Sequence, residues 1–216
     1  MLQGGDVVSA KNNVSLRSDN RSVLIAGSQP EERASITSAA GNVTMSGQGE
    51  DGSIVLNLAD IKAESGKILV NGTTTGAGMP SGVRFSNVSM TAENADGGGI
   101  NVYANSKGVF NDGQEFGSLY FSGENDFNSP VMNFTGENTG SERGSGVAFV
   151  YAKNTFNGNA TISGSGGKGV SFRTSTLNFD DGKSEIKAVS NQDSDAADSY
   201  FGGGLFFLMD GLLIVM

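Results

Sequence analysis

Asn159–Phe172 reads NATISGSGGKGVSF and contains both of the patterns that recur most clearly along this chain. In its first half, Ala160 and Ile162 alternate with small polar residues, and in its second half Val170 and Phe172 do the same. An apolar residue at every second position is typical of a β-strand with one buried face. Glycines lie between the two halves, and glycine permits the sharp turns that other residues resist. The stretch therefore predicts two short strands joined by a turn.

The two patterns recur elsewhere in the chain. The first returns as NVTMSG at Asn42–Gly47 and NVSMTA at Asn87–Ala92, and the second as GVRF at Gly82–Phe85 and GVAF at Gly146–Phe149. A third pattern is FSGEN or FTGEN, at Phe121–Asn125 and Phe134–Asn138. The spacings lie near multiples of about 20–24 residues, which predicts a structural repeat of that size.

Apolar pairs with the same alternation continue along the sequence, and turn-forming dipeptides lie between them. The predicted strand pairs are Val43/Met45, Val83/Phe85, Val88/Met90, Ile100/Val102, Val147/Phe149, Val170/Phe172 and Leu177/Phe179. The predicted turns are Asp51-Gly52, Asn71-Gly72, Asp112-Gly113, Asn157-Gly158 and Asp181-Gly182.

The composition excludes several classes of protein. The 216 residues include 33 Gly and only 3 Pro, with no Cys, His or Trp, and the net charge is -9. Glycine and small polar residues are poor in helix interiors, which argues against a helical bundle. Without Cys or His there is no disulfide, no thiolate or imidazole zinc site, and no catalysis by a His base or Cys nucleophile. The acidic balance, with no Lys/Arg cluster, argues against a nucleic-acid partner.

A short repeat unit with two or three strands predicts an all-β fold, a parallel β-helix or β-solenoid with coils of about 20–24 residues. Val, Ile, Phe and Met would point inward, Gly and Asn would form the corners, and Ser, Thr and Asn would face water. An antiparallel sandwich is the rival fold, because it also has short alternating strands at regular spacing. It does not by itself explain motifs that recur at multiples of one length.

With these motifs, most of residues 10–200 resembles the secreted β-helical adhesins of Gram-negative bacteria. The filamentous-haemagglutinin and high-molecular-weight adhesin group, exported by two-partner secretion, is the nearest in texture, and autotransporter passenger domains are similar. The resemblance implies a right-handed parallel β-helix at the cell surface or outside the cell, contributing to virulence. Its implied partners are host-cell or bacterial surface glycans and proteins, further copies of itself, and an outer-membrane transporter during secretion.

The sequence predicts two segments. Residues 1–204 form the repeat segment, and residues 205–216 (LFFLMDGLLIVM) form either an apolar terminal strand or a truncated, non-native tail. Residues 1–20 lack the apolar run of roughly 7–15 residues that a secretory signal needs. Since the secretion domain of such adhesins is also missing, we expect an internal piece of a longer passenger or a truncated reading frame.

Candidate sites are few, and the sequence predicts no catalytic residue, cofactor or metal ligand. The possible glycan acceptors are the motif asparagines Asn42, Asn87 and Asn159, each in an Asn-x-Ser/Thr sequon. The same residues are better explained as the entry to a repeated strand. Asp193, Asp195 and Asp198 suggest calcium ligands only weakly, because they match neither a calcium-binding nonapeptide nor an EF-hand.

The leading functional hypothesis is a structural and adhesive segment of a bacterial surface adhesin, which is not an enzyme. One alternative is a polysaccharide-active enzyme, for which Glu124 and Glu137 of the FSGEN and FTGEN motifs would stack on adjacent coils as paired carboxylates. The other alternative is a segment of a phage tail fibre or spike.

Overall fold

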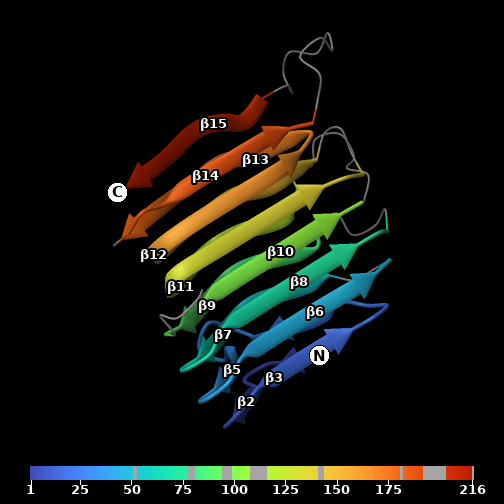
Figure 1. Cartoon of the computed structure of the whole chain (residues 1–216), viewed down its shortest axis with the longest axis vertical. Helices are drawn as coiled ribbons and strands as arrows, with labels where there is room; N and C mark the ends of the chain where they lie inside the picture. Colours follow the sequence, from blue (N-terminus) through green and yellow to red (C-terminus); the bar gives the residue numbers. More distant parts are fainter. Residues whose placement is uncertain are drawn as a thin grey trace.

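The structure, a computed structural model, is a β-solenoid (Figure 1). It describes residues 1–50, 53–76, 81–93, 99–107, 116–140, 144–180 and 182–191, together with the backbone of 203–215. Every regular element in these residues is a strand, and every pairing between strands is parallel. None of them forms a helix with the length and apolarity that crossing a membrane requires.

The strands stack in chain order from the N-terminal to the C-terminal end (Figure 1). Their bounds are β1 Leu2–Gln3, β2 Val7–Ala10, β3 Val14–Ser18, β4 Val23–Ala26, β5 Ala34–Ser38, β6 Val43–Gly49, β7 Ile54–Ala63, β8 Ile68–Thr74, β9 Val83–Ala92, β10 Ile100–Ser106, β11 Gly117–Asn138, β12 Ser145–Gly166, β13 Lys168–Asp180, β14 Glu185–Ser190 and β15 Gly203–Val215.

The pairings divide each coil into three sides, and the sides stack into three faces. Face 1 contains β1, β4 and the first parts of β7, β9, β11, β12, β13 and β15. Face 2 contains β2, β5 and the following parts of the same long strands. Face 3 contains β3, β6, β8, β10, the last parts of β11 and β12, and β14. The predicted stacking of parallel strands is confirmed.

Most coils are longer than the sequence spacing predicts. On face 1, Val23 pairs with Ile54 and Val83 pairs with Leu119, and both advances exceed the predicted repeat. On the same face the advance falls within the predicted range at two places, where Leu2 pairs with Ile25 and where Val147 pairs with Val170. The predicted coil length is therefore wrong for most of the molecule. The GVxF motif lies on face 1 each time it occurs, so its own spacings are whole coils.

The other two motifs led to a wrong estimate of the coil length, because the copies of each motif lie on different sides of a coil. NVTMSG and NATISG enter face 3, whereas NVSMTA enters face 2. FSGEN and FTGEN both lie in β11, the first at the end of face 1 and the second on face 3. Spacings between motifs on different faces therefore include a fraction of a coil.

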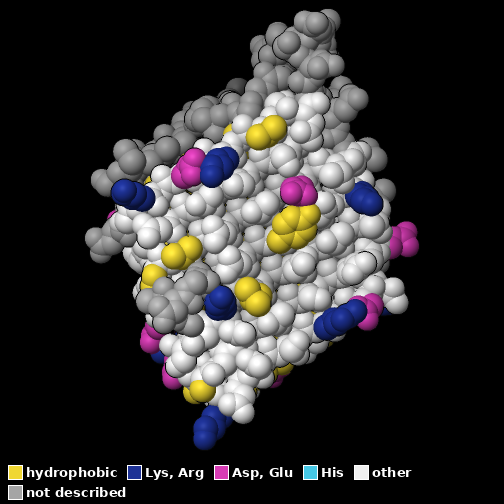
Figure 2. Space-filling view, viewed as in Figure 1, with side chains coloured by type: hydrophobic (Ala, Val, Ile, Leu, Met, Phe, Trp, Pro, Cys, Tyr) yellow, Lys and Arg dark blue, Asp and Glu magenta, His cyan; other side chains and the backbone are white. Residues whose placement is uncertain are grey.

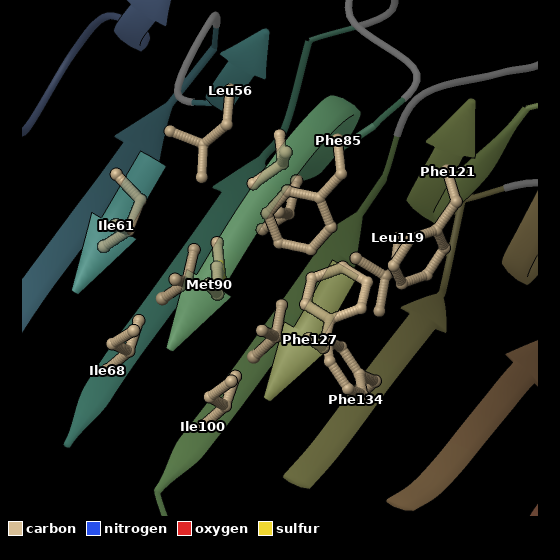
Figure 3. Packing of buried hydrophobic residues seen from close by; sticks show 14 of the residues in the cluster. Leu56, Ile61, Ile68, Phe85, Met90, Ile100, Leu119, Phe121, Phe127 and Phe134 are labelled. Atoms are coloured by element: carbon tan, nitrogen blue, oxygen red, sulfur yellow. The ribbon is translucent and has the colours of Figure 1, made fainter. Parts of the chain in front are cut away.

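The interior is a stack of inward-pointing apolar side chains from all three faces (Figure 3). Towards the N-terminal end it is aliphatic, with Ile25, Ile36 and Leu56 fully buried. From β9 onwards phenylalanines join the aliphatic side chains, and Phe121 and Phe149 stack with ring centroids 4.6 Å apart. All seven predicted strand pairs place their residues inward, with Phe179 only partly buried.

Small residues form a second inward column where face 3 turns towards face 1. Gly47, Gly72, Ala104, Gly136 and Gly164 are paired in that order from coil to coil. A Cβ on Gly72, Gly136 or Gly164 would overlap the backbone carbonyl oxygen of the glycine that opens a GVxF motif, namely Gly82, Gly146 and Gly169 respectively. The predicted turn at Asn71-Gly72 is therefore wrong, because Gly72 lies inside β8 to let two backbones approach.

The other predicted turns can be placed only in part. Asp51-Gly52, Asp112-Gly113 and Asp181 lie outside the described residues. Asn157-Gly158 lies within β12, where Gly158 has φ 126° and the register against β11 shifts between Asn128 and Val131. This dipeptide is therefore the corner at which the chain passes from face 2 to face 3.

The corner between faces 1 and 2 is made by one residue in the left-handed region of backbone space. Gly123 has φ 63°, and the corresponding residues of other coils are Leu58 (49°), Asn87 (56°), Tyr151 (50°) and Thr174 (45°). Glycine and asparagine tolerate this conformation, whereas a β-branched residue is strained in it. Thr174 is therefore the least suited of the five to its position.

Replacing Thr174 by asparagine is expected to raise the free energy of unfolding by about 0.5–1 kcal/mol, because asparagine relieves part of the left-handed strain. The Thr174 side chain is exposed, so little packing is lost. Equilibrium denaturation in urea measures the change. Thr176→Asn, two residues later in the same strand, is the control and should be neutral or destabilising. Equal losses in both variants would contradict the argument.

Candidate functional site

From β6 to the last part of β12, the outer surface of face 3 carries parallel columns of uncharged side chains, and on β3 and β14 the same columns carry Arg17, Glu185 and Lys187. One column runs through Thr44, Leu69, Asn101, Asn133 and Thr161, and the next through Ser46, Asn71, Tyr103, Thr135 and Ser163. These side chains face outward because they alternate with the buried residues of the core. Seen from this side, the surface is mostly white in Figure 2, with few and scattered charged side chains.

A groove of about 470 Å³ crosses four strands of this face. Tyr103 and Leu69 contribute the larger apolar surfaces, and hydroxyl and amide side chains contribute the polar ones. The residues that line the groove are Thr44, Met45, Ser46, Leu69, Val70, Asn71, Asn101, Val102, Tyr103, Asn133 and Thr135. None of them carries a formal charge at neutral pH, so hydrogen bonding and apolar contact are the chemistry that the groove offers.

Hydrogen bonds at one end of this groove orient the half-buried side chain of Tyr103. The phenol donates to Oε2 of Glu137 at 2.7 Å, and the Nδ2 of Asn105 donates to the phenol oxygen at 3.4 Å. Glu137 lies on the neighbouring coil, in register with Asn105. Burial raises the pKa of the Tyr103 phenol, and the hydrogen bond to the Glu137 carboxylate raises it further. The phenol therefore stays neutral and keeps donating through the physiological range.

We expect the Tyr103 phenol to ionise at a pH above its ordinary pKa of 10.0. Its neutral form is favoured in the folded state, so this contribution to stability is complete below the ordinary pKa and is lost as the pH rises through the raised value. Titration of phenolate absorbance in wild type and Tyr103→Phe isolates the group by difference. A difference curve centred at or below the ordinary pKa would contradict the proposed environment.

A second groove, of about 410 Å³, lies at the corner between faces 1 and 2, and its lining includes the charged residues Arg33, Glu124, Asp126 and Lys153. Arg33 there is held by Oδ1 of Asp60 at 2.8 Å and by the carbonyl oxygen of Asn87 at 2.8 Å. Lys153 lies 3.8 Å from Glu124. Because Arg33 is bonded to three acceptors on the next two coils, it has a structural role that needs no ligand, whereas Lys153 and Glu124 are largely exposed.

The predicted stacking of Glu124 and Glu137 on adjacent coils is wrong. Both lie in β11, and they pair with different residues of the next coil, Glu124 with Lys153 and Glu137 with Ser165. The reason is that FSGEN and FTGEN occupy different faces of one coil. The geometry therefore does not pair these two carboxylates for cleavage of a glycosidic bond.

The three motif asparagines all bond to a neighbouring coil. The Oδ1 of Asn42 accepts the backbone N–H of Lys67 at 2.9 Å, and that of Asn159 accepts the backbone N–H of Lys183 at 2.8 Å. Asn87, at the corner of faces 1 and 2, accepts the N–H of Glu124 at 3.1 Å. These bonds give the motif a structural role as a link between coils, whether or not a glycan is attached.

The remaining sequence candidates lie towards the C-terminal end of the chain. Asp193, Asp195 and Asp198 lie outside the described residues, as do the side chains of residues 205–216. The backbone of β15 pairs with β13 and extends faces 1 and 2 by a further coil. Within the described residues, no group of three or more Asp or Glu side chains is placed to hold a metal ion.

Sequence reasoning missed Tyr103, Asn101 and Asn133 as a group. The Ile100/Val102 alternation already places Asn101 and Tyr103 on the outer side of a strand. Their alignment with Leu69 and Asn133 depends on the register between coils, which spacing alone did not reveal.

Comparisons of the chain with protein-family models, with curated proteins and with solved structures gave no match.

Proposed function

We propose that this chain is a structural and adhesive segment of a bacterial surface adhesin that attaches through face 3. The observation that carries the proposal is the scarcity of charge on the outer surface of that face between β6 and β12. From Thr44 to Ser165, Glu137 is the single formally charged side chain among the outward-facing described residues of β6, β8, β10 and the last parts of β11 and β12. Ion pairs lie at the two ends of face 3, at Arg17–Asp19 and Lys187–Glu185, and on face 2 at Arg33–Asp60 and Lys62–Glu93.

Attachment would arise from many weak contacts acting together. Stacked coils repeat hydroxyl and amide groups at the strand spacing of about 4.8 Å, so one face offers many similar contacts to a partner surface. The same stacking gives the segment length along one direction, which would hold a binding tip away from the cell. Export to the bacterial surface belongs to this proposal and is supported by the resemblance of the repeated motifs to secreted adhesins.

The test is display of the chain on the surface of a non-adherent bacterial strain, followed by counts of bacteria bound to epithelial monolayers and by settling assays for aggregation. We expect attachment or aggregation above the empty display vector. Display at equal density without either effect would overturn the proposal.

Two double variants, each adding two glutamates to one face, provide a matched comparison. Thr44→Glu with Asn133→Glu adds two negative charges to face 3 and is expected to abolish most of the gained attachment. Thr37→Glu with Thr91→Glu adds the same charge to face 2, where both positions flank Lys62 in register. This second variant should retain attachment. Equal losses in both variants would show that face 3 is not the contact surface.

A further inference from the structure

We propose that the groove on face 3 binds a neutral oligosaccharide, with Tyr103 as the surface on which a sugar ring stacks. This inference rests on the proposed attachment function and names the chemical class of its ligand. Three features of the groove support it: an oriented aromatic ring, amide groups with bonding capacity to spare, and a lining without charge.

The ring of Tyr103 is fixed from its far end. Its phenol oxygen is bonded to Glu137 at 2.7 Å and to Asn105 at 3.4 Å, so little side-chain freedom remains to be lost on binding. Leu69, on the preceding coil, adds a second apolar surface to the same groove. Sugar rings have apolar C–H faces and polar edges, and such a ligand matches an aromatic side chain surrounded by hydrogen-bonding groups.

The amides beside the ring can bond to hydroxyl groups. The Nδ2 of Asn133 donates to Oδ1 of Asn101 at 3.0 Å. This bond uses one amide hydrogen of Asn133 and one lone pair of Asn101, so each amide keeps both a donor and an acceptor. The Asn71 side chain lines the same groove and forms no hydrogen bond within the described residues. Paired donors and acceptors match sugar hydroxyls, which both donate and accept.

The uncharged lining of the groove and the acidity of the chain both favour a neutral ligand. The lining contains no acid or base, so it cannot neutralise a uronate or a sulfate. The chain carries a net charge of -9, which repels acidic polysaccharides at a distance. Since the groove crosses four strands, its length of roughly 14 Å suits a short oligosaccharide or a stretch of a longer neutral chain.

Affinity electrophoresis of the purified chain tests the proposal. Native gels would contain galactomannan, xyloglucan, mixed-linkage β-glucan or dextran as neutral probes, and polygalacturonate or hyaluronate as acidic ones. We expect retardation in at least one neutral gel and none in the acidic gels. Absence of retardation in every neutral gel, or retardation in the acidic gels alone, would overturn the proposal.

Variants locate the site. Tyr103→Ala is expected to weaken the apparent affinity at least about tenfold, since it removes the stacking surface. Tyr103→Phe keeps the ring and should bind within a few fold of wild type. Tyr151→Ala is the matched control, because Tyr151 is 58% exposed on β12 at the corner between faces 1 and 2. Circular dichroism melts would establish that each variant is folded. Wild-type retardation of folded Tyr103→Ala would place binding elsewhere and overturn the assignment.

The display assay separates this inference from the function on which it rests. If bacteria attach and the retarding polysaccharide competes with them, both proposals are supported. If bacteria attach while the purified chain is not retarded by any neutral polysaccharide, the glycan assignment fails and the adhesive function stands. If the chain is retarded but displayed bacteria do not attach, the adhesive function fails and the groove remains a saccharide site.

Discussion

Replacing Phe121 by alanine is expected to lower the free energy of unfolding by about 3–5 kcal/mol, the range for deletion of a large buried aromatic side chain. Phe121 is fully buried between the rings of two neighbouring coils: its ring centroid lies 4.6 Å from the stacked ring of Phe149 and 5.4 Å from the tilted ring of Phe85. It also contacts Phe127 and Phe134 from the other two faces of its own coil. The alanine variant would leave a cavity that rigid neighbouring coils cannot close.

Urea denaturation followed by circular dichroism measures this effect. Phe121→Leu preserves much of the volume and should cost clearly less than the alanine variant. Val189→Ala is the surface control, because Val189 is 57% exposed. Its change should lie within about 0.5 kcal/mol of zero. A loss below about 1 kcal/mol for Phe121→Ala would show that the phenylalanine stack is not the centre of the core.

The second large effect is expected from a single added methyl group. Gly136→Ala would place a Cβ against the carbonyl oxygen of Gly146, and backbone cannot move aside as a flexible side chain would. We expect a loss of about 3 kcal/mol, at the upper end of the range for overpacking. The loss arises although alanine has the better intrinsic propensity and adds apolar surface to the core.

The same denaturation experiment tests this prediction against Gly5→Ala. An added Cβ at Gly5 meets no atom within 4 Å, so that variant should be close to wild type in stability. Gly72→Ala should behave like Gly136→Ala, because its Cβ would meet Gly82 in the same way. Wild-type stability in both Gly136→Ala and Gly72→Ala would refute the close approach of the two backbones.

Much of the fold could be predicted from local pattern. Alternation at Val43/Met45 or Val170/Phe172 predicts a strand with a buried side wherever that strand is placed. The coil length could not be predicted so well, because motifs on different faces are separated by fractions of a coil and because the connection from face 3 to the next face 1 varies, from Gly166–Lys168 to Ser106–Gly117. The corner between faces 1 and 2 is also hard to find in the sequence. Leu58, Tyr151 and Thr174 make the same corner as Gly123, and nothing in their local sequence marks it.

The candidate site was less accessible for a related reason. In sequence, Asn71-Gly72 looks like a turn. The actual role of Gly72 depends on Gly82, whose backbone carbonyl it approaches where face 3 turns towards face 1. Tyr103 is a single tyrosine among polar residues until register places it beside Leu69 and Glu137. Both are properties of stacking, and stacking is decided by all coils together.

The order of the pairings has a mechanical consequence. In the described residues, the strands of each coil pair with strands of the coils before and after it, and a side chain such as Arg33 reaches one coil further. A force pulling the two chain ends apart would therefore peel coils from an end one by one. The coils differ in length, since one advance runs from Val147 to Val170 and a longer one from Val83 to Leu119. Single-molecule extension should therefore show unequal steps, each releasing roughly 80–125 Å of chain. A surface protein built this way would yield gradually under shear and would lose one coil before it lost the next.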